Sequence, residues 1–169
     1  QMYVKSATPG LVSGLEKQGY ETVAMHPYRA SSWNRQEVYA RFGFEKQLYE
    51  DDFSEDAGRL RTYITDSADY QKIIELYENR QPDAPFFMFN VTMQNHGGYS
   101  EDEPAVDVTV MPVDQELQTP QMLEYLSLIR ESDAAFKELT VYFSEAEEDT
   151  VILMFGDHQP SMDEGVSEF

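Results

Sequence analysis

Cysteine is absent from this sequence. Its absence excludes a disulfide framework, a thiolate metal site and a cysteine nucleophile. Basic residues are also few, because 12 lysines and arginines stand against 32 aspartates and glutamates and leave a net charge of −20. A surface this acidic repels nucleic acids and anionic lipids, so the composition argues against a function in binding nucleic acid.

Long hydrophobic runs are missing as well. The longest, residues 85–93 and 151–155, are far shorter than the roughly 20 apolar residues that a membrane helix requires. The first residues lack the pattern of a signal peptide. Since the chain begins without methionine and stops after residues 165–169 without a helix-ending signal, we expect it to be a piece of a longer protein.

The residues that are present predict one folded domain over 1–169. Hydrophobic residues make up 41% and aromatic residues 13% of the chain, a composition unlike that of disordered proteins. Residues 1–41 hold five basic and three acidic side chains, which gives a net charge of +2. Residues 42–169 hold seven basic and 29 acidic side chains, which gives a net charge of −22. Three of the seven arginines lie within residues 29–41, so this segment is where an anion would bind.

Hydrophobic periodicity predicts alternating helices and strands. A helix is expected after Thr8 as N-cap and Pro9 at its first position, and further helices over the segments 32–42 (after a loop), 66–79 and 121–145. Strands are expected over 20–25, 85–93 and 150–155, with an exposed acidic excursion over 101–116. Nearly continuous apolar strands that alternate with helices indicate an α/β fold, with a mainly parallel sheet flanked by helices on both faces.

Each of the three histidines follows one of these apolar strands: His26, His96 and His158. The carboxyl ends of parallel strands meet at one edge of a sheet, so the three side chains are expected to share a site there. The alternative for each is an ordinary buried or loop histidine. Gly97 and Gly98 after His96 fit either a strand-end turn or a turn that lets His96 reach a substrate.

Asp157 and His158 follow a glycine at the end of the last predicted strand. An adjacent carboxylate and imidazole suit Mn²⁺, Zn²⁺ or Mg²⁺ as ligands. The alternative is a turn in which Asp157 accepts hydrogen bonds from nearby backbone N–H groups.

Residues 26–35 combine an imidazole, two guanidinium groups and the only indole of the chain. Arg35 can hold a phosphate or sulfate through two hydrogen bonds, and Trp33 can supply a flat wall or an N–H donor. The alternative is a surface loop in which Trp33 fills the core and the arginines pair with the abundant carboxylates.

Three separated motifs, in residues 26–44, at Asn95-His96 and in residues 155–160, resemble the extracellular catalytic domain of bacterial lipoteichoic acid synthases and related phosphoglycerol transferases. These enzymes belong to the sulfatase and alkaline-phosphatase-like superfamily, so the resemblance implies a partial domain of that fold. It implies that Asp157 and His158 bind a divalent metal, Mn²⁺ or Mg²⁺. It also implies that the glycerol phosphate headgroup is surrounded by four side chains: His26, Trp33, Arg35 and His96.

The resemblance is incomplete in one respect. The family also binds its metal through a glutamate and a threonine nucleophile, which lie upstream of the segment that resembles this chain, and Thr8 matches a helix cap instead. We therefore expect these 169 residues to be a soluble, inactive piece of a membrane protein that works at the extracellular face of the bacterial cell membrane.

The complete protein is expected to move glycerol phosphate from phosphatidylglycerol to a polymer or another hydroxyl acceptor, as in lipoteichoic acid synthesis. His96 or His26 would assist proton transfer. Two alternatives are a sulfatase or phosphodiesterase of the same superfamily and a binding domain that holds an anion without catalysis.

Overall fold

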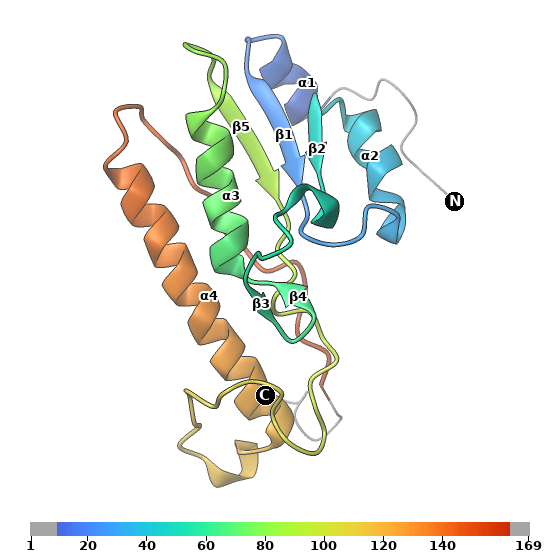
Figure 1. The fold of residues 1–169 in the computed structure, drawn as a ribbon, viewed down its shortest axis with the longest axis vertical. Coiled ribbons are helices and arrows are strands. Elements are labelled where there is room, and N and C mark those ends of the chain that lie inside the picture. The colour runs from blue at the N-terminus through green and yellow to red at the C-terminus, as the bar shows by residue number, and fades with distance from the viewer. Residues whose placement is uncertain (1–9, 163–169) are drawn as a thin grey trace.

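A parallel sheet of three strands forms the centre of the molecule (Figure 1). The structure is a computed structural model that describes residues 10–162. In the sheet the strand order is β2-β1-β5, with β1 at Glu21–Met25, β2 at Lys46–Leu48 and β5 at Phe86–Asn90. A separate antiparallel pair is formed by β3 (Arg59–Leu60) and β4 (Tyr63–Ile64).

Helices cover both faces of this sheet. The hydrophobic side chains of α1 (Leu11–Glu16) and α2 (Arg35–Phe42) pack on one face, and those of α3 (Asp66–Glu78) and α4 (Pro120–Ser144) belong to the core on the other. In Figure 1, α4 lies on the outer side of α3. Three short 3₁₀ helices complete the elements: Ser32–Asn34, Glu50–Asp52 and Gln115–Leu117. The observed layers confirm the predicted α/β fold with a parallel sheet flanked by helices.

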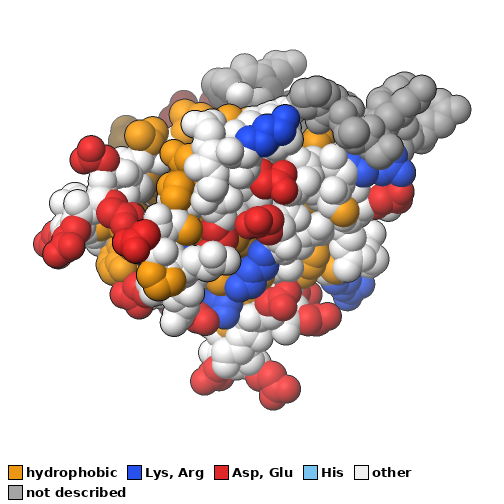
Figure 2. Space-filling view, turned by 90° about the horizontal axis from the view of Figure 1, so that it is seen from above, with side chains coloured by type: hydrophobic (Ala, Val, Ile, Leu, Met, Phe, Trp, Pro, Cys, Tyr) orange, Lys and Arg blue, Asp and Glu red, His pale blue; other side chains and the backbone are white. Residues whose placement is uncertain are grey.

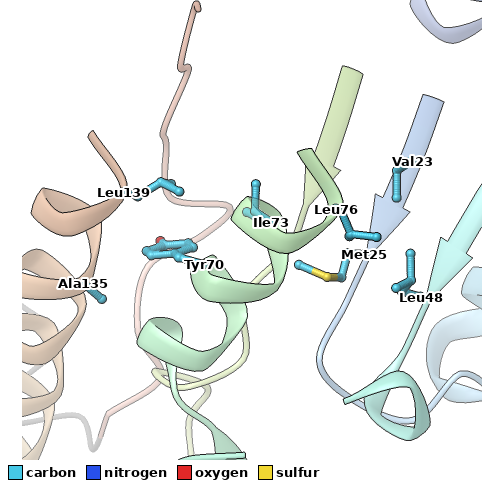
Figure 3. Close-up of a cluster of buried hydrophobic side chains, with 8 residues drawn as sticks. All are labelled: Val23, Met25, Leu48, Tyr70, Ile73, Leu76, Ala135 and Leu139. Carbon is cyan, nitrogen blue, oxygen red and sulfur yellow. The ribbon is translucent and has the colours of Figure 1, made fainter. Parts of the chain in front are cut away.

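Alternation along β1 divides its side chains between the two cores. Val23 and Met25 are fully buried on the α3 side, where Figure 3 shows Met25 next to Leu76 of α3, and Leu48 of β2 belongs to the same cluster. Ala24 belongs to the core on the α1 and α2 side. Both faces of β1 are apolar because both are covered, as expected for a parallel sheet.

Side-chain caps define where the two long helices begin. Thr65 Oγ1 accepts from the Ala68 N–H at the start of α3, and Thr119 Oγ1 accepts from the Met122 N–H at the start of α4. These starts agree with the sequence to within one residue. At α1 the first helical residue is Leu11, preceded by Gly10, and the predicted cap at Thr8 lies outside the described residues.

The prediction of a buried strand over residues 150–155 is wrong. This segment forms no strand, and the exposed fractions of Val151 and Phe155 are 95% and 71%. A strand exists only where a neighbour completes its backbone hydrogen bonds, and no strand within residues 10–162 pairs with this segment. Its apolar composition indicated burial, but composition does not supply a partner.

The acidic excursion over residues 101–116 is confirmed as a mostly exposed segment without strands. It leads into α4, the longest helix of the molecule. Among residues 10–162, no helix combines the length and apolar character needed to cross a membrane.

Replacement of Met25 by alanine is expected to destabilise the fold. The side chain is fully buried between β2 and α3, so its loss leaves a cavity that should lower the free energy of unfolding by about 2–5 kcal/mol. Met111→Ala is the matched control, because Met111 is 63% exposed. Urea denaturation of both variants measures the difference, and equal midpoints would contradict the described core.

Candidate functional site

His26 leaves the sheet at the carboxyl end of β1 and is fully buried. Its backbone N–H donates to the Leu48 carbonyl at 3.0 Å, and its ring Nδ1 lies 2.7 Å from the Val91 carbonyl oxygen. Leu48 ends β2 and Val91 follows β5. The imidazole is therefore held by backbone groups at the ends of the two neighbouring strands.

The environment of His26 keeps its imidazole neutral. Burial, followed by the nearby charges of Arg35 and His96, lowers the pKa of His26 to about 4. A carbonyl oxygen can only accept, so the proton of the neutral ring resides on Nδ1 and is donated to Val91. Within residues 10–162 the buried Nε2 atom has no hydrogen-bond partner, and it carries a lone pair. His26 thus holds an unpaired acceptor in the interior, beside the site.

A tight turn brings Trp33 and Arg35 to the start of α2. Trp33 and Asn34 both adopt left-handed backbone conformations, with φ of +50° and +58°. Such conformations cost non-glycine residues about 1 kcal/mol or more each and are enriched at functional sites. The Arg35 guanidinium lies 5.3 Å from the Trp33 ring centroid, and its Nη1 donates to the Tyr39 hydroxyl at 3.3 Å.

His96 packs against Trp33, although 63 residues separate them in the sequence. Their ring centroids are 6.1 Å apart, and the His96 ring lies 5.8 Å from that of Tyr63. Tyr63 is 5.8 Å from Tyr28, which is 6.2 Å from His26. We call these five rings the aromatic arc. It runs from the buried His26 to Trp33, which is 65% exposed.

Four predicted residues therefore lie together. His26, His96 and Trp33 belong to the aromatic arc, and Arg35 covers the Trp33 ring. The alternative in which Trp33 fills the core is wrong, since its side chain is largely exposed. Figure 2 looks at the end of the molecule where the strands begin, and no histidine is visible among its coloured residues. The order of the chain itself places His26 directly after β1 and His96 after β5, beyond the carboxyl ends of these strands.

Sequence reasoning missed two members of the arc, Tyr28 and Tyr63. Tyr28 lies within residues 26–35, the segment considered for its two arginines. Its position two residues after His26 is the sequence feature that places it near this histidine. Tyr63 lies in β4, which is two residues long and too short to produce a periodic pattern.

Asp157 and His158 lie on an exposed segment, with side chains that are 74% and 72% exposed. In Figure 1 the chain after α4 runs past the sheet in the direction of β5 and reaches the end where the strands finish. Within residues 10–162, neither side chain hydrogen-bonds to the aromatic arc, and no group of three or more histidine and acidic side chains is arranged to hold a metal. The structure thus brings the arc together but leaves the Asp157-His158 pair separate from it.

The pair itself suits a divalent metal as two of its ligands. His158 Nδ1 is 2.8 Å from the Gln159 carbonyl oxygen, which fixes the neutral tautomer with a lone pair on Nε2. Nε2 lies 3.6 Å from Asp157 Oδ2, close enough for one ion to touch both atoms. Asp157 Oδ1 accepts from the His158 N–H at 2.9 Å, so the predicted turn-type hydrogen bond is also present.

The neutral state of His26 is testable by titration. Because its pKa in the folded chain is about 4, against 6.5 for an unperturbed histidine, we expect the ¹⁵N shifts of this ring to show the Nδ1–H tautomer at every pH above about 4. The unfolded chain binds more protons between these two values, so His26 makes the free energy of unfolding rise with pH from about 4 to 6.5. His26→Asn should remove that rise. A folded-state midpoint near 6.5 would contradict the described burial.

Comparison with known proteins identifies the family. The sulfatase family model matches residues 3–168. A putative cyclic beta-1,2-glucan modification protein of Rhizobium meliloti is 30% identical over 164 residues, covering 96% of this chain and 25% of that protein. The chain spans about a quarter of the length of the curated relatives it matches.

Solved structures show the same fold. The lipoteichoic acid synthase LtaP of Listeria monocytogenes superposes with a TM-score of 0.68 at 20% identity, covering 85% of this chain and 34% of that one. The phosphoglycerol transferase GacH of Streptococcus pyogenes, solved with sn-glycerol-1-phosphate, gives a TM-score of 0.52 at 27% identity, covering 82% and 37%. On the family match, which extends over nearly the whole chain, this protein belongs to the sulfatase family.

Proposed function

We propose that this chain forms the headgroup-binding part of a phosphoglycerol transferase. The complete protein would move glycerol phosphate from phosphatidylglycerol to a polymer or another hydroxyl acceptor at the extracellular face of a bacterial membrane. The observation that carries the proposal is the joint placement of Arg35, Trp33, His96 and neutral His26 at the carboxyl ends of β1 and β5.

The chemistry of these side chains matches a glycerol phosphate. Arg35 supplies a permanent positive charge and several N–H donors for phosphoryl oxygens. The first N–H groups of α2 lie beside it, and the side chain of the preceding Asn34 does not cap them. The indole of Trp33, which is 65% exposed, offers an apolar wall to the glycerol carbons.

The relatives support the same ligand class. GacH is a phosphoglycerol transferase that was solved with sn-glycerol-1-phosphate. The name of the Rhizobium relative refers to a sugar polymer, a cyclic beta-1,2-glucan, and not to lipoteichoic acid. We therefore leave the acceptor as a polymer or another hydroxyl compound, and a donor that carries glycerol phosphate fits the residues of this chain.

His96 is suited to move a proton, and the buried His26 to support the residues that orient the headgroup. His96 is exposed and lies next to Trp33 in the aromatic arc, where a reacting hydroxyl can approach. His26 is buried with its Nδ1 proton held by Val91, so it keeps one protonation state across neutral pH. We therefore assign proton transfer to His96 and support of the residues that orient the headgroup to His26.

Asp157 and His158 would hold Mn²⁺ or Mg²⁺ as two of its ligands. When bound, the metal would supply positive charge for the phosphoryl oxygens. The nucleophile and the further ligands that the family uses match no residue of this sequence, so residues 1–169 alone are expected to have no transferase activity.

Loss of Arg35 should weaken binding of sn-glycerol-1-phosphate. A hydrogen bond to a charged group contributes about 1.5–3 kcal/mol, so Arg35→Ala should raise the Kd about 10- to 100-fold in calorimetric titrations. The Kd of Arg35→Lys should lie between those of the wild type and Arg35→Ala, because lysine keeps the charge but loses the paired N–H donors. Arg41→Ala is the matched control, since it removes one charge from the same helix and its guanidinium bonds to Glu37. Equal losses in the two alanine variants would argue for general charge attraction only.

An activity assay of the complete protein distinguishes a transferase from a hydrolase. With a fluorescent phosphatidylglycerol analogue and an alcohol acceptor, a transferase yields diacylglycerol and a glycerol phosphate ester of the acceptor. A phosphodiesterase yields free glycerol phosphate instead, and a binding domain yields neither product. Either of the last two outcomes would contradict the proposal.

Metal binding by residues 1–169 should be weak. Asp157 and His158 supply two ligands, whereas tight sites usually have three or four protein ligands. Calorimetry should show no micromolar Mn²⁺ site, and Mn²⁺ should barely raise the melting temperature. The double variant Asp157→Asn, His158→Ala tests the site, and Asp149→Asn controls for attraction of cations to the net charge of −20. A one-to-one micromolar site that only the double variant loses would show that another carboxylate, such as Asp163 or Glu164, completes it.

A further inference from the structure

Arg61, which no sequence pattern marked, contacts the loop that carries His96. It lies in the turn between β3 and β4, and its side chain is only 8% exposed. Its Nη2 group donates to the carbonyl oxygens of Gln94 at 2.7 Å and of His96 at 2.9 Å. One guanidinium nitrogen thereby fixes the backbone on both sides of Asn95.

Glu124 of α4 is the charge partner of Arg61 and holds the far side of the same loop. Its carboxylate is fully buried, with Oε1 3.5 Å from Arg61 Nη1. Oε2 accepts from the backbone N–H of Ala105 at 2.8 Å and of Ser100 at 3.3 Å. The ion pair therefore connects the β3-β4 turn and α4 to both ends of the segment 94–105.

Two tyrosines complete the environment of Arg61. Its guanidinium lies 5.2 Å from the Tyr63 ring centroid and 5.4 Å from that of Tyr99. Tyr99 donates its hydroxyl proton to the Asn95 carbonyl at 2.6 Å, and Tyr63 is the ring of the aromatic arc next to His96. Arg61 also adopts φ of +54°, an unfavourable conformation for a non-glycine residue that the surrounding contacts must maintain.

We propose that Arg61, paired with Glu124, is a positioning residue that holds the His96 ring against Trp33 and Tyr63. The effect of Arg61 on the reaction rate rests on the proposed function. The placement of His96 by Arg61 rests only on the contacts described above. A buried ion pair is often no more stabilising than apolar side chains of the same volume. The donors of Arg61 nevertheless point at the two carbonyls that set the direction of the His96 loop. Misplacement of a reacting group by about 1 Å can lower a rate about 100-fold.

Nuclear magnetic resonance of the full chain tests the placement of His96 without any activity. The chain contains one tryptophan and three histidines, so the contacts of Trp33 with His96 can be assigned directly. In the wild type we expect nuclear Overhauser contacts between the two rings, and we expect Arg61→Met to lose them. The matched control is Arg59→Met. Arg59 lies two residues earlier, is exposed, and bonds to Glu50 and to the Thr62 carbonyl, so this variant should keep the contacts.

Kinetics of the complete protein test the catalytic consequence. Arg61→Met should lower kcat at least tenfold while KM for the phosphatidylglycerol donor changes less than threefold, and Arg61→Lys should recover part of the rate. If Arg61→Met does not fold, Arg61→Lys and Glu124→Gln replace it, and weakened ring contacts are expected in both.

The outcomes distinguish the two proposals. Unchanged contacts between Trp33 and His96 in folded Arg61 variants overturn the positioning role. Lost contacts with an unchanged kcat would support the positioning of His96 by Arg61 but overturn its catalytic consequence. If the wild-type protein has no transferase activity, only the proposed function is contradicted. The resonance experiment still shows whether Arg61 holds the His96 ring against Trp33.

Discussion

The parallel pairing of β1 with β5 is the constraint on which the site depends. Its register sets Met25 opposite Asn90, so the next residues, His26 and Val91, leave the sheet side by side. The Val91 carbonyl then receives the Nδ1 proton of His26, while Leu48 of β2 receives the His26 backbone proton. His26 is fixed by backbone groups, so substitutions of surrounding side chains alter its orientation little. A shift of the β1-β5 register by one residue would turn the side chains of the shifted strand to the opposite face of the sheet. It would also break the hydrogen bond between His26 and Val91.

Burial beneath the site imposes neutrality on groups that are ordinarily charged. Burial lowers the pKa of His26 to about 4 and raises that of Asp69, in α3, to about 8, with the neighbouring Asp66 adding to the second effect. The side-chain amide of Asn90, the last residue of β5, donates to Asp69. As pH rises from about 4 to 6.5 the His26 contribution to stability grows, whereas the Asp69 contribution declines as pH rises toward 8. Near pH 6 both His26 and Asp69 are therefore neutral.

The sequence predicted the parts of this arrangement that depend on local pattern. Apolar strands that end in His26 and near His96 show where the chain reaches the edge of the sheet, since strand ends follow from hydrophobic runs. The meeting of Trp33 with His96 required two left-handed residues in succession, and neither is glycine, so residue type gave no signal. Arg61 was missed because the strands beside it are two residues long. Residues 150–155 were misjudged because apolar composition reports a preference for burial but not the presence of a pairing strand.

Arg35 and the Asp157-His158 pair are held in different ways, and this difference has a thermodynamic consequence for the ligands proposed for them. Arg35 and the aromatic arc are fixed by the sheet, by α2 and by the loop bound to Arg61, so the proposed phosphate site would be ordered before a ligand arrives. In the part of the chain that the structure describes, the hydrogen bonds of Asp157 and His158 stay within residues 157–159, and the pair follows an exposed apolar segment. A metal that binds this pair must therefore order the backbone and side chains around it, at a cost of about 1–2 kcal/mol for each residue fixed. In the proposed function, therefore, the phosphate group would meet an ordered set of side chains, whereas metal affinity would depend on further contacts that restrain Asp157 and His158.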